Sequence, residues 1–360
     1  MTPHIVLALS AHGFGHIAQM APIVRHLKQQ QPALKITVRS SAPGFKLLER
    51  LGSDIEVQEV TTDIGMIQAS ALEVSVRESG DAYEEFHRRW QQKVDHEARA
   101  LERLNADLLL ANVPYLALAG AHEAGIPSAA LCSLNWADIY QHYFAGKRPG
   151  AEQIHEQMLT AYNSAQVFMK PAPSMPMPTL TNGMDIGPLA QLGRDRRQEI
   201  NASLGLTSDQ RLVMVSLGGM ELQIPVDHWP TEPGLCFIVP GSWNARHPNI
   251  TVFESLDMPF ADVLRSCDLL IAKPGYGSFA EAACLGLPVL YLERKNWPEA
   301  PFLIDWLQRH GRCALLQESD FNSGRLVDMI DRLCEPRGIP AVAPTGIEQA
   351  SRVILDVLEA

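Results

Sequence analysis

A glycine-rich stretch in the second half of the chain has residue types that suit phosphate binding. It reads Ala272-Lys273-Pro274-Gly275-Tyr276-Gly277-Ser278-Phe279-Ala280-Glu281 and continues to Gly286-Leu287-Pro288. An apolar strand over 269–272 leads into the turn, and we expect a helix to open at Ser278 with Glu281 in its first turn. Backbone N–H groups at a glycine turn and a helix start bind phosphate, and Glu281 is placed to bond the paired hydroxyls of a ribose. The stretch therefore predicts a pocket for a nucleoside diphosphate.

Two further segments of the second half could complete this pocket. Gly218 and Gly219 form a glycine turn after an apolar strand over 212–217. The turn is weak evidence alone, but with the first stretch it makes two loops that could face one diphosphate. After a strand over 289–292, Trp297 and Glu299 offer an aromatic face and a carboxylate, which suit a sugar ring and its hydroxyls. A solvated loop is the alternative for this segment.

A third glycine turn, Gly13-Phe14-Gly15-His16, follows the first apolar run of the chain. Its spacing, G-x-G-x-x-A, is a weak dinucleotide fingerprint. The expected acidic residue after the second strand is replaced by Arg39, which leaves only NADP as a possible dinucleotide. We favour another interpretation, in which Gly13 and Gly15 bring the backbone close to a ligand and His16 points into a cleft. The alternative is a histidine bonded to the backbone at a helix start.

Polar side chains follow other strands of the first half. Asn112 ends the strand over 107–111 and could touch and orient His16, while Asp63 follows the third strand. Trp136, Asp138 and Tyr140 follow the fifth strand. These groups could contact a second substrate.

Short apolar runs alternate with helical patterns in both halves, which predicts parallel sheets covered on both faces. Strands are expected at 4–10, 35–39, 55–60, 107–111, 128–132 and 166–169, then at 212–217, 235–239, 250–253, 269–272, 289–292 and 313–316. Helices of the first half are expected at 17–30, 45–51, 82–103 and 116–123. The fold class is α/β, with two doubly wound Rossmann-like domains and a ligand cleft between them.

The proline-rich segment 171–192 looks like neither helix nor strand, and we interpret it as an interdomain linker. The expected domains are therefore 1–170 and 193–345, with a terminal helix over 346–360 that could pack back on the first domain.

Composition limits the classes of function. The chain has 360 residues and a net charge of −11, which argues against nucleic acid as a partner because phosphate backbones require clustered Lys and Arg. The six cysteines are scattered and suit buried thiols better than a metal or disulfide role. No signal peptide is visible and no apolar run approaches a membrane span, so we expect a cytoplasmic protein.

These motifs resemble those of inverting glycosyltransferases of the GT-B fold, such as UDP-sugar transferases and the peptidoglycan N-acetylglucosaminyltransferase. In that family a G-x-G-H or G-H turn opens the acceptor domain, and a G-x-x-S/T…E…G-x-P run binds the donor nucleotide. The second run is matched here by Gly275, Ser278, Glu281, Gly286 and Pro288.

A closer resemblance, over nearly the whole chain, is to the N-terminal glycosyltransferase-like domain of L-arabinokinases. The matching stretches are 12–16, 63–72, 124–126, 136–140, 273–277 and 299–303. The kinase half of those proteins is absent from this sequence, so the resemblance does not imply sugar-kinase activity.

The resemblance implies transfer of a sugar from a nucleotide-diphosphate donor, with UDP-sugar as the expected donor, to an acceptor hydroxyl, with inversion and without metal or other cofactor. His16 would be the general base. Lys273, Gly275, Tyr276, Gly277, Ser278, Gly218 and Gly219 would surround the diphosphate, Glu281 would hold the ribose and Glu299 the sugar; Gly13 and Gly15 are assigned to the same ligand site.

The chain departs from the plant enzymes at Asn112, where they often carry an aspartate beside the histidine. An amide can hold a tautomer but cannot stabilise an imidazolium by charge. Three possibilities follow: Asp63 or Asp138 supports His16, the base is weak, or the protein binds nucleotide sugar without catalysis as a regulatory module. A UDP-sugar 2-epimerase, which shares the fold, is a further alternative.

Overall fold

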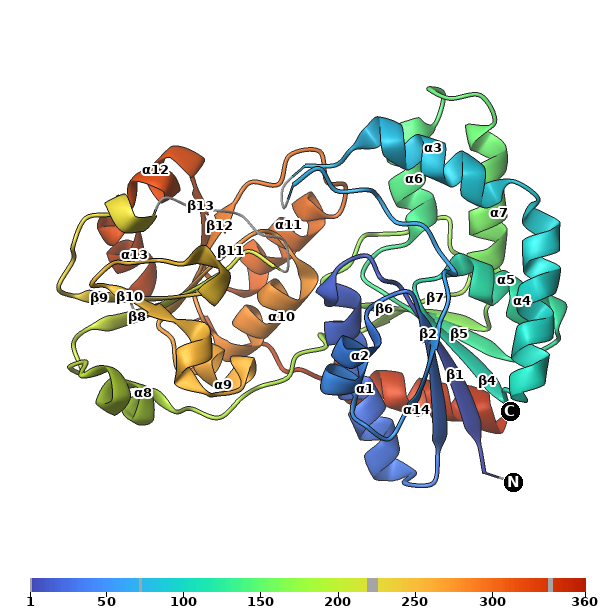
Figure 1. Cartoon of the computed structure of the whole chain (residues 1–360), viewed down its shortest axis with the longest axis horizontal. Coiled ribbons are helices and arrows are strands. Elements are labelled where there is room, and N and C mark those ends of the chain that lie inside the picture. The colour runs from blue at the N-terminus through green and yellow to red at the C-terminus, as the bar shows by residue number, and fades with distance from the viewer. Residues whose placement is uncertain (1, 71–72, 219–225, 336–338) are drawn as a thin grey trace. The chain divides into compact units, whose positions relative to one another are not determined.

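The computed structural model describes residues 2–70, 73–218, 226–335 and 339–360. Within them the chain divides into two compact units. The first unit comprises Met1–Ile67, Val74–Leu189 and Thr345–Ala360, and the second comprises Gln68–Glu73 and Ala190–Pro344. Figure 1 shows the elements of both units.

The first unit is built on a seven-stranded parallel sheet with the order β3-β2-β1-β4-β5-β6-β7. Its strands are β1 (His4–Leu9), β2 (Lys35–Ser40), β3 (Glu56–Glu59), β4 (Leu108–Asn112), β5 (Ser128–Leu131), β6 (Val167–Pro171) and β7 (Gly183–Ile186). Its helices are α1 (Phe14–Gln30), α2 (Gly44–Leu51), α3 (Val76–His87), α4 (Trp90–Leu104), α5 (Tyr115–Glu123), α6 (Trp136–Phe144), α7 (Ala151–Asn163) and α14 (Gly346–Glu359).

Helices cover both faces of this sheet. In Figure 1, α1, α2 and α14 lie on one side of it and α4, α5 and α7 on the other. Every residue of β1 and β4 is therefore buried, which explains why these strands are apolar except for one terminal residue each and show no alternating pattern. The register pairs Leu9 of β1 with Asn112 of β4, so both strands end at the same edge of the sheet.

Two sequence predictions for this unit need correction. The segment 171–192 is not wholly a linker, because Gly183–Ile186 forms β7 and pairs in parallel with β6. Three of its four residues are exposed, so this edge strand lacks the apolar run that would predict it. The single helix expected over 82–103 is two helices, because Arg89 takes a left-handed conformation (φ 56°) between α3 and α4.

The second unit is a six-stranded parallel sheet with the order β10-β9-β8-β11-β12-β13. Its strands are β8 (Arg211–Ser216), β9 (Leu235–Val239), β10 (Ile250–Val252), β11 (Leu269–Ala272), β12 (Val289–Leu292) and β13 (Cys313–Leu316). Its helices are α8 (Arg197–Leu204), α9 (Phe260–Arg265), α10 (Tyr276–Leu285), α11 (Ala300–His310), α12 (Glu318–Ser323) and α13 (Val327–Cys334), with short 3₁₀ turns at Val226–His228, Gly241–Trp243 and Phe253–Leu256.

Alternate residues of β8 enter separate apolar clusters on the two faces of the second sheet. Leu212 and Met214 join one cluster, and Val213 and Val215 join the other. This period of two is the geometry of a strand buried on both sides. Both sheets have the doubly wound order in which the first strand stands at the switch point, so the prediction of two Rossmann-like units is confirmed.

Across the described ranges, no helix combines the length and the apolar character required to span a bilayer.

Candidate functional site

His16 stands in the first turn of α1, immediately after the carboxyl end of β1. Gly13 precedes the helix with a φ of 80°, a left-handed conformation that favours glycine. The chain turns there from the sheet into the helix and leaves the imidazole buried, with 6% of the residue exposed. His16 Nδ1 lies 2.7 Å from Asn112 Oδ1 at the end of the neighbouring strand. The predicted contact between these two side chains is therefore present.

A chain of amide hydrogen bonds fixes the orientation of Asn112. Its Nδ2 donates to Gln19 Oε1 at 2.9 Å, and Gln19 Nε2 donates to Ser133 Oγ at 3.2 Å. With its amide nitrogen engaged by Gln19, Asn112 presents the oxygen to His16. His16 Nδ1 therefore carries the hydrogen and Nε2 has the lone pair that can accept a proton.

Burial makes His16 a weak base. Desolvation lowers its pKa from 6.5 to about 4, opposed only in part by the hydrogen bond with Asn112. At neutral pH the imidazole is therefore uncharged, which is the form that accepts a proton.

Asp63 is connected to the histidines of this turn through Trp136. Trp136 Nε1 donates to Asp63 Oδ2 at 2.7 Å. The Trp136 ring contacts His12 at a centroid distance of 4.9 Å and His16 at 5.9 Å. Burial raises the pKa of Asp63 to about 6, although hydrogen bonds with Ser10 and Trp136 oppose the shift. Asp63 thus positions the ring of Trp136 beside His16.

The raised pKa of Asp63 predicts a pH-dependent cost to stability. A carboxyl whose folded pKa lies above its unfolded value of about 3.9 stabilises the fold most below that value, and this contribution is lost as pH rises to about 6. We expect the stability of wild type relative to Asp63→Asn to fall by about 2–3 kcal/mol between pH 4 and pH 7. Urea unfolding at several pH values measures this difference. Asp356→Asn, at an exposed position of α14, is the matched control, and a pH-independent difference for Asp63→Asn would contradict the assignment.

Asp138 and Tyr140 have other surroundings. The Asp138 backbone N–H donates to Asn135 Oδ1 at 2.7 Å, and its carboxylate accepts from Thr179 Oγ1 at 3.3 Å. Burial raises the pKa of Asp138. Tyr140 packs edge-on against Tyr83 at 4.8 Å. Of the two carboxylates proposed to support His16, it is Asp63 that reaches the imidazole through an intervening ring.

Sequence reasoning missed Gln19, Ser133 and Cys132, whose Sγ lies 3.8 Å from His16 Nδ1. One signal was available for Gln19, which follows His16 by three positions and so shares its face of α1.

In the second unit, α10 begins two residues earlier than the sequence suggested. Gly275 is its N-cap and Tyr276 its first residue, so Gly277 and Ser278 lie in the first turn and Glu281 in the second. Tyr276 and Gly277, which were expected to belong to the glycine turn, are helical residues instead. Apart from each glycine's chain neighbours and its own helix backbone, no described atom lies within 4 Å of where a Cβ would stand at Gly277, Gly13 or Gly15. The backbone at these glycines is open to a ligand.

Lys273 brings a positive charge to the start of α10. Ala272 pairs with Ser216 in the parallel register of β11 and β8, so both following loops begin at one edge of the sheet. A Cβ built on Gly218, whose φ is 84°, would stand 3.3 Å from Lys273 Nζ. Burial and the charge of Arg294 lower the pKa of Lys273 to about 8. Gly219, predicted with Gly218, lies outside the described residues.

The segment with Trp297 and Glu299 is not a solvated loop at these two residues, which are 3% and 5% exposed. Trp297 Nε1 donates to Glu299 Oε2 at 3.1 Å. The guanidinium carbon of Arg294 lies 4.0 Å from the centroid of the Trp297 ring, so a cation already occupies the aromatic face that was expected to meet a sugar. Arg294 Nη2 also donates to Gln68 Oε1 at 3.1 Å.

Within the described part of the chain, no three His, Cys, Asp or Glu side chains gather in a way that could hold a metal ion.

Comparison with solved structures identifies the fold of this chain as the GT-B glycosyltransferase fold. The calicheamicin glycosyltransferase superposes with a TM-score of 0.61 at 15% identity, covering 99% of this chain and 95% of that one. The spinosyn rhamnosyltransferase complexed with thymidine diphosphate gives 0.58 at 17% identity, covering 99% and 96%. A putative UDP-N-acetylglucosamine 2-epimerase from Listeria monocytogenes gives 0.58 at 15% identity, covering 100% and 96%.

Over most of its length the chain is also distantly homologous to L-arabinokinase of Arabidopsis thaliana. The two are 26% identical over 334 residues, which cover 91% of this chain. The chain spans about a third of that relative, since the match covers 32% of its length. No protein-family model matches the chain.

Proposed function

We propose that this protein is an inverting, metal-independent glycosyltransferase that moves a sugar from a nucleoside-diphosphate donor, a UDP-sugar, to an acceptor hydroxyl. The second unit would hold the donor and the first unit would supply the general base. The acceptor is a small molecule, a glycan or a lipid-linked sugar, and the protein requires neither nucleic acid nor a membrane span.

The observation that carries this proposal is the grouping of Lys273, Gly218 and the start of α10. The ammonium group lies beside a left-handed glycine turn and follows the strand that leads into a helix N-terminus. The helix dipole and the open N–H groups of Gly277 and Ser278 favour a dianionic phosphate. Lys273 and Arg294 can also offset the negative charge that develops on a leaving diphosphate. This set of groups supports departure of the diphosphate without a divalent cation.

His16 fits the base of the proposed reaction in its tautomer and in its charge state. Asn112 accepts from Nδ1, which leaves Nε2 able to take the proton of an acceptor hydroxyl as that oxygen attacks the anomeric carbon. Its pKa of about 4 means that the base is fully in its neutral form above pH 5.

The low pKa of His16 favours a second candidate, a protein that binds nucleotide sugar without turnover. A base with a pKa of about 4 has little driving force to take a proton from a hydroxyl, and Asn112 adds no negative charge to stabilise the imidazolium. A UDP-sugar 2-epimerase is a third candidate, supported by the comparable fold similarity of the putative UDP-N-acetylglucosamine 2-epimerase.

One assay separates the three candidates. The protein is incubated with UDP-glucose, UDP-galactose and UDP-N-acetylglucosamine, with and without a panel of hydroxylated acceptors, in the presence of EDTA. Glycosylated product is expected. Release of free sugar and UDP without acceptor would favour the epimerase, and donor binding without any product would favour the binding protein. An NADPH titration followed by fluorescence tests the dinucleotide alternative, for which we expect no change.

Gly277 allows binding and stability to be separated. Its backbone is not left-handed, and a Cβ there meets no described atom within 4 Å, so Gly277→Ala should unfold at the same or a slightly higher temperature. The added methyl group would stand at the N-terminus of α10, and we expect UDP binding to weaken about tenfold or more. Scanning calorimetry measures the unfolding temperature, and titration calorimetry measures the UDP affinity. Gly234→Ala, also with open space around it, should change neither, and full UDP affinity in Gly277→Ala would contradict the placement of the diphosphate.

A further inference from the structure

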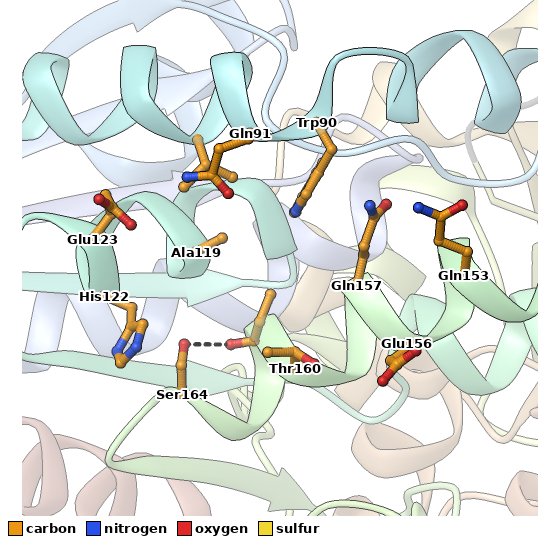
Figure 2. A pocket seen from close by; sticks show the side chains of 12 residues that line it. Trp90, Gln91, Ala119, His122, Glu123, Gln153, Glu156, Gln157, Thr160 and Ser164 are labelled. Carbon is orange, nitrogen blue, oxygen red and sulfur yellow. Dashed lines mark hydrogen bonds between the residues drawn. The ribbon is translucent and has the colours of Figure 1, made fainter.

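A hollow of about 400 Å³ lies in the first unit between α4, α5 and α7. Its lining does not include His16 or the side chains described around it, Asn112, Gln19, Asp63 and Trp136. Figure 2 shows Trp90 and Gln91 on α4, His122 and Glu123 on α5, and Gln153 and Gln157 on α7 around one opening. Its volume falls within the roughly 300–1,000 Å³ typical of small-molecule sites.

The aromatic wall of this hollow is held in place from behind. Trp90 stacks on His87 with ring centroids 4.8 Å apart and planes 14° apart, and His87 stacks on Tyr115 at 5.5 Å and 18°. His87 Nδ1 lies 2.7 Å from Gln157 Oε1, and its Nε2 lies 3.1 Å from the Tyr115 hydroxyl. The Trp90 ring is thus the outer member of a bonded stack.

These bonds also orient Gln157. Burial lowers the pKa of His87 to about 4, so the ring carries one hydrogen at neutral pH. Nδ1 donates it to Gln157 Oε1, and Nε2 accepts from the hydroxyl of Tyr115. With its oxygen engaged, Gln157 keeps its amide N–H groups for another partner.

The polar groups of the hollow suit hydroxyls better than ions. The amides of Gln153 and Gln157 can donate and accept, the carboxylates of Glu123 and Glu156 accept, and Thr160 does both. No lysine or arginine is among the side chains that line it, which disfavours phosphate or carboxylate ligands. An aromatic face beside hydroxyl-binding groups matches a sugar ring, which has C–H bonds on its faces and hydroxyls at its edge.

We propose that this hollow is a binding site for a neutral saccharide, separate from the proposed donor pocket of the second unit. The proposal does not require the transferase activity. An ammonium ligand would also suit Trp90 and the two carboxylates, but unlike a sugar it offers no acceptor to the N–H groups of Gln153 and Gln157.

Saturation-transfer NMR on the full chain tests the site. The probes are methyl glucoside, methyl galactoside and N-acetylglucosamine, with tetramethylammonium for comparison, each titrated first without UDP and then with saturating UDP to fill the second unit. We expect saturable binding of at least one sugar. Trp90→Ala and Gln153→Ala should each weaken it about tenfold or more, and Glu152→Ala, an exposed change on the same helix that does not line the hollow, should leave it unchanged.

Gln153 is exposed, so Gln153→Ala keeps the test valid if Trp90→Ala does not fold. The proposal is overturned by the absence of saturable binding of all three sugars or by binding that both variants retain. Binding that UDP removes, or binding of tetramethylammonium in place of the sugars, would also overturn it.

Discussion

Replacing His16 with alanine should lower the transfer rate by about 100-fold or more while leaving UDP affinity nearly unchanged. General-base catalysis contributes roughly 10²–10⁴-fold, and the hydrogen bond at Nδ1 of His16 leaves its Nε2 able to accept a proton. UDP is expected to bind in the second unit, so its affinity should not depend on this side chain. Steady-state kinetics and calorimetry on the same preparation measure both quantities.

The matched control for this experiment is His26→Ala, which removes a half-buried histidine ten residues further along α1. It should retain the full rate. The pH profile gives a second check. A base with a pKa of about 4 stays almost entirely unprotonated between pH 7 and pH 5, so protonation of His16 should not lower the rate in that range. An unchanged rate in His16→Ala would remove the histidine from the mechanism.

Replacing Lys273 with methionine should weaken UDP binding by about 10- to 100-fold. Methionine keeps the unbranched shape and most of the length of the side chain but removes a partly buried charge, and hydrogen bonds to charged groups contribute about 1.5–3 kcal/mol. Uridine, which carries no phosphate, should lose much less affinity. Calorimetric titration with UDP and with uridine therefore separates a lost phosphate contact from a general disruption of the pocket.

The pKa of Lys273 predicts an additional signature. Since the pKa of the free amine is about 8 and a bound diphosphate raises it, UDP binding near pH 8.5 should take up protons. The measured enthalpy would then vary with the ionisation enthalpy of the buffer, and the variation should vanish in Lys273→Met. Lys295→Met, an exposed change in the same unit, is the control. Equal UDP affinities in Lys273→Met and wild type would exclude Lys273 from the diphosphate site.

The sheets were predictable because their central strands are buried on both faces. Leu269–Ala272 is apolar throughout, His4–Leu9 is apolar after its first residue, and each is followed by a glycine turn. Gly183–Ile186 is mostly exposed at a sheet edge, so it has no such pattern. The break at Arg89 has neither glycine nor proline in the sequence to indicate it.

The candidate site was predictable in its residue types but less so in its contacts. The bond between His16 and Asn112 follows from two strand ends at one sheet edge. The route from Asp63 to His16 depends on where Trp136 packs, which no spacing reveals. Likewise, the approach of Lys273 to Gly218 requires β8 and β11 to be neighbours, although 52 residues separate the strands that end at Ser216 and begin at Leu269.

The most direct test of the donor pocket is calorimetric titration of the purified protein with UDP in the presence of EDTA, followed by GDP and dTDP. We predict saturable UDP binding without metal that is weakened in Glu281→Ala, because the carboxylate is expected to hold the ribose hydroxyls. The absence of binding by all three nucleotides, or unchanged UDP affinity in Glu281→Ala, would contradict the nucleotide pocket on which the proposed function rests.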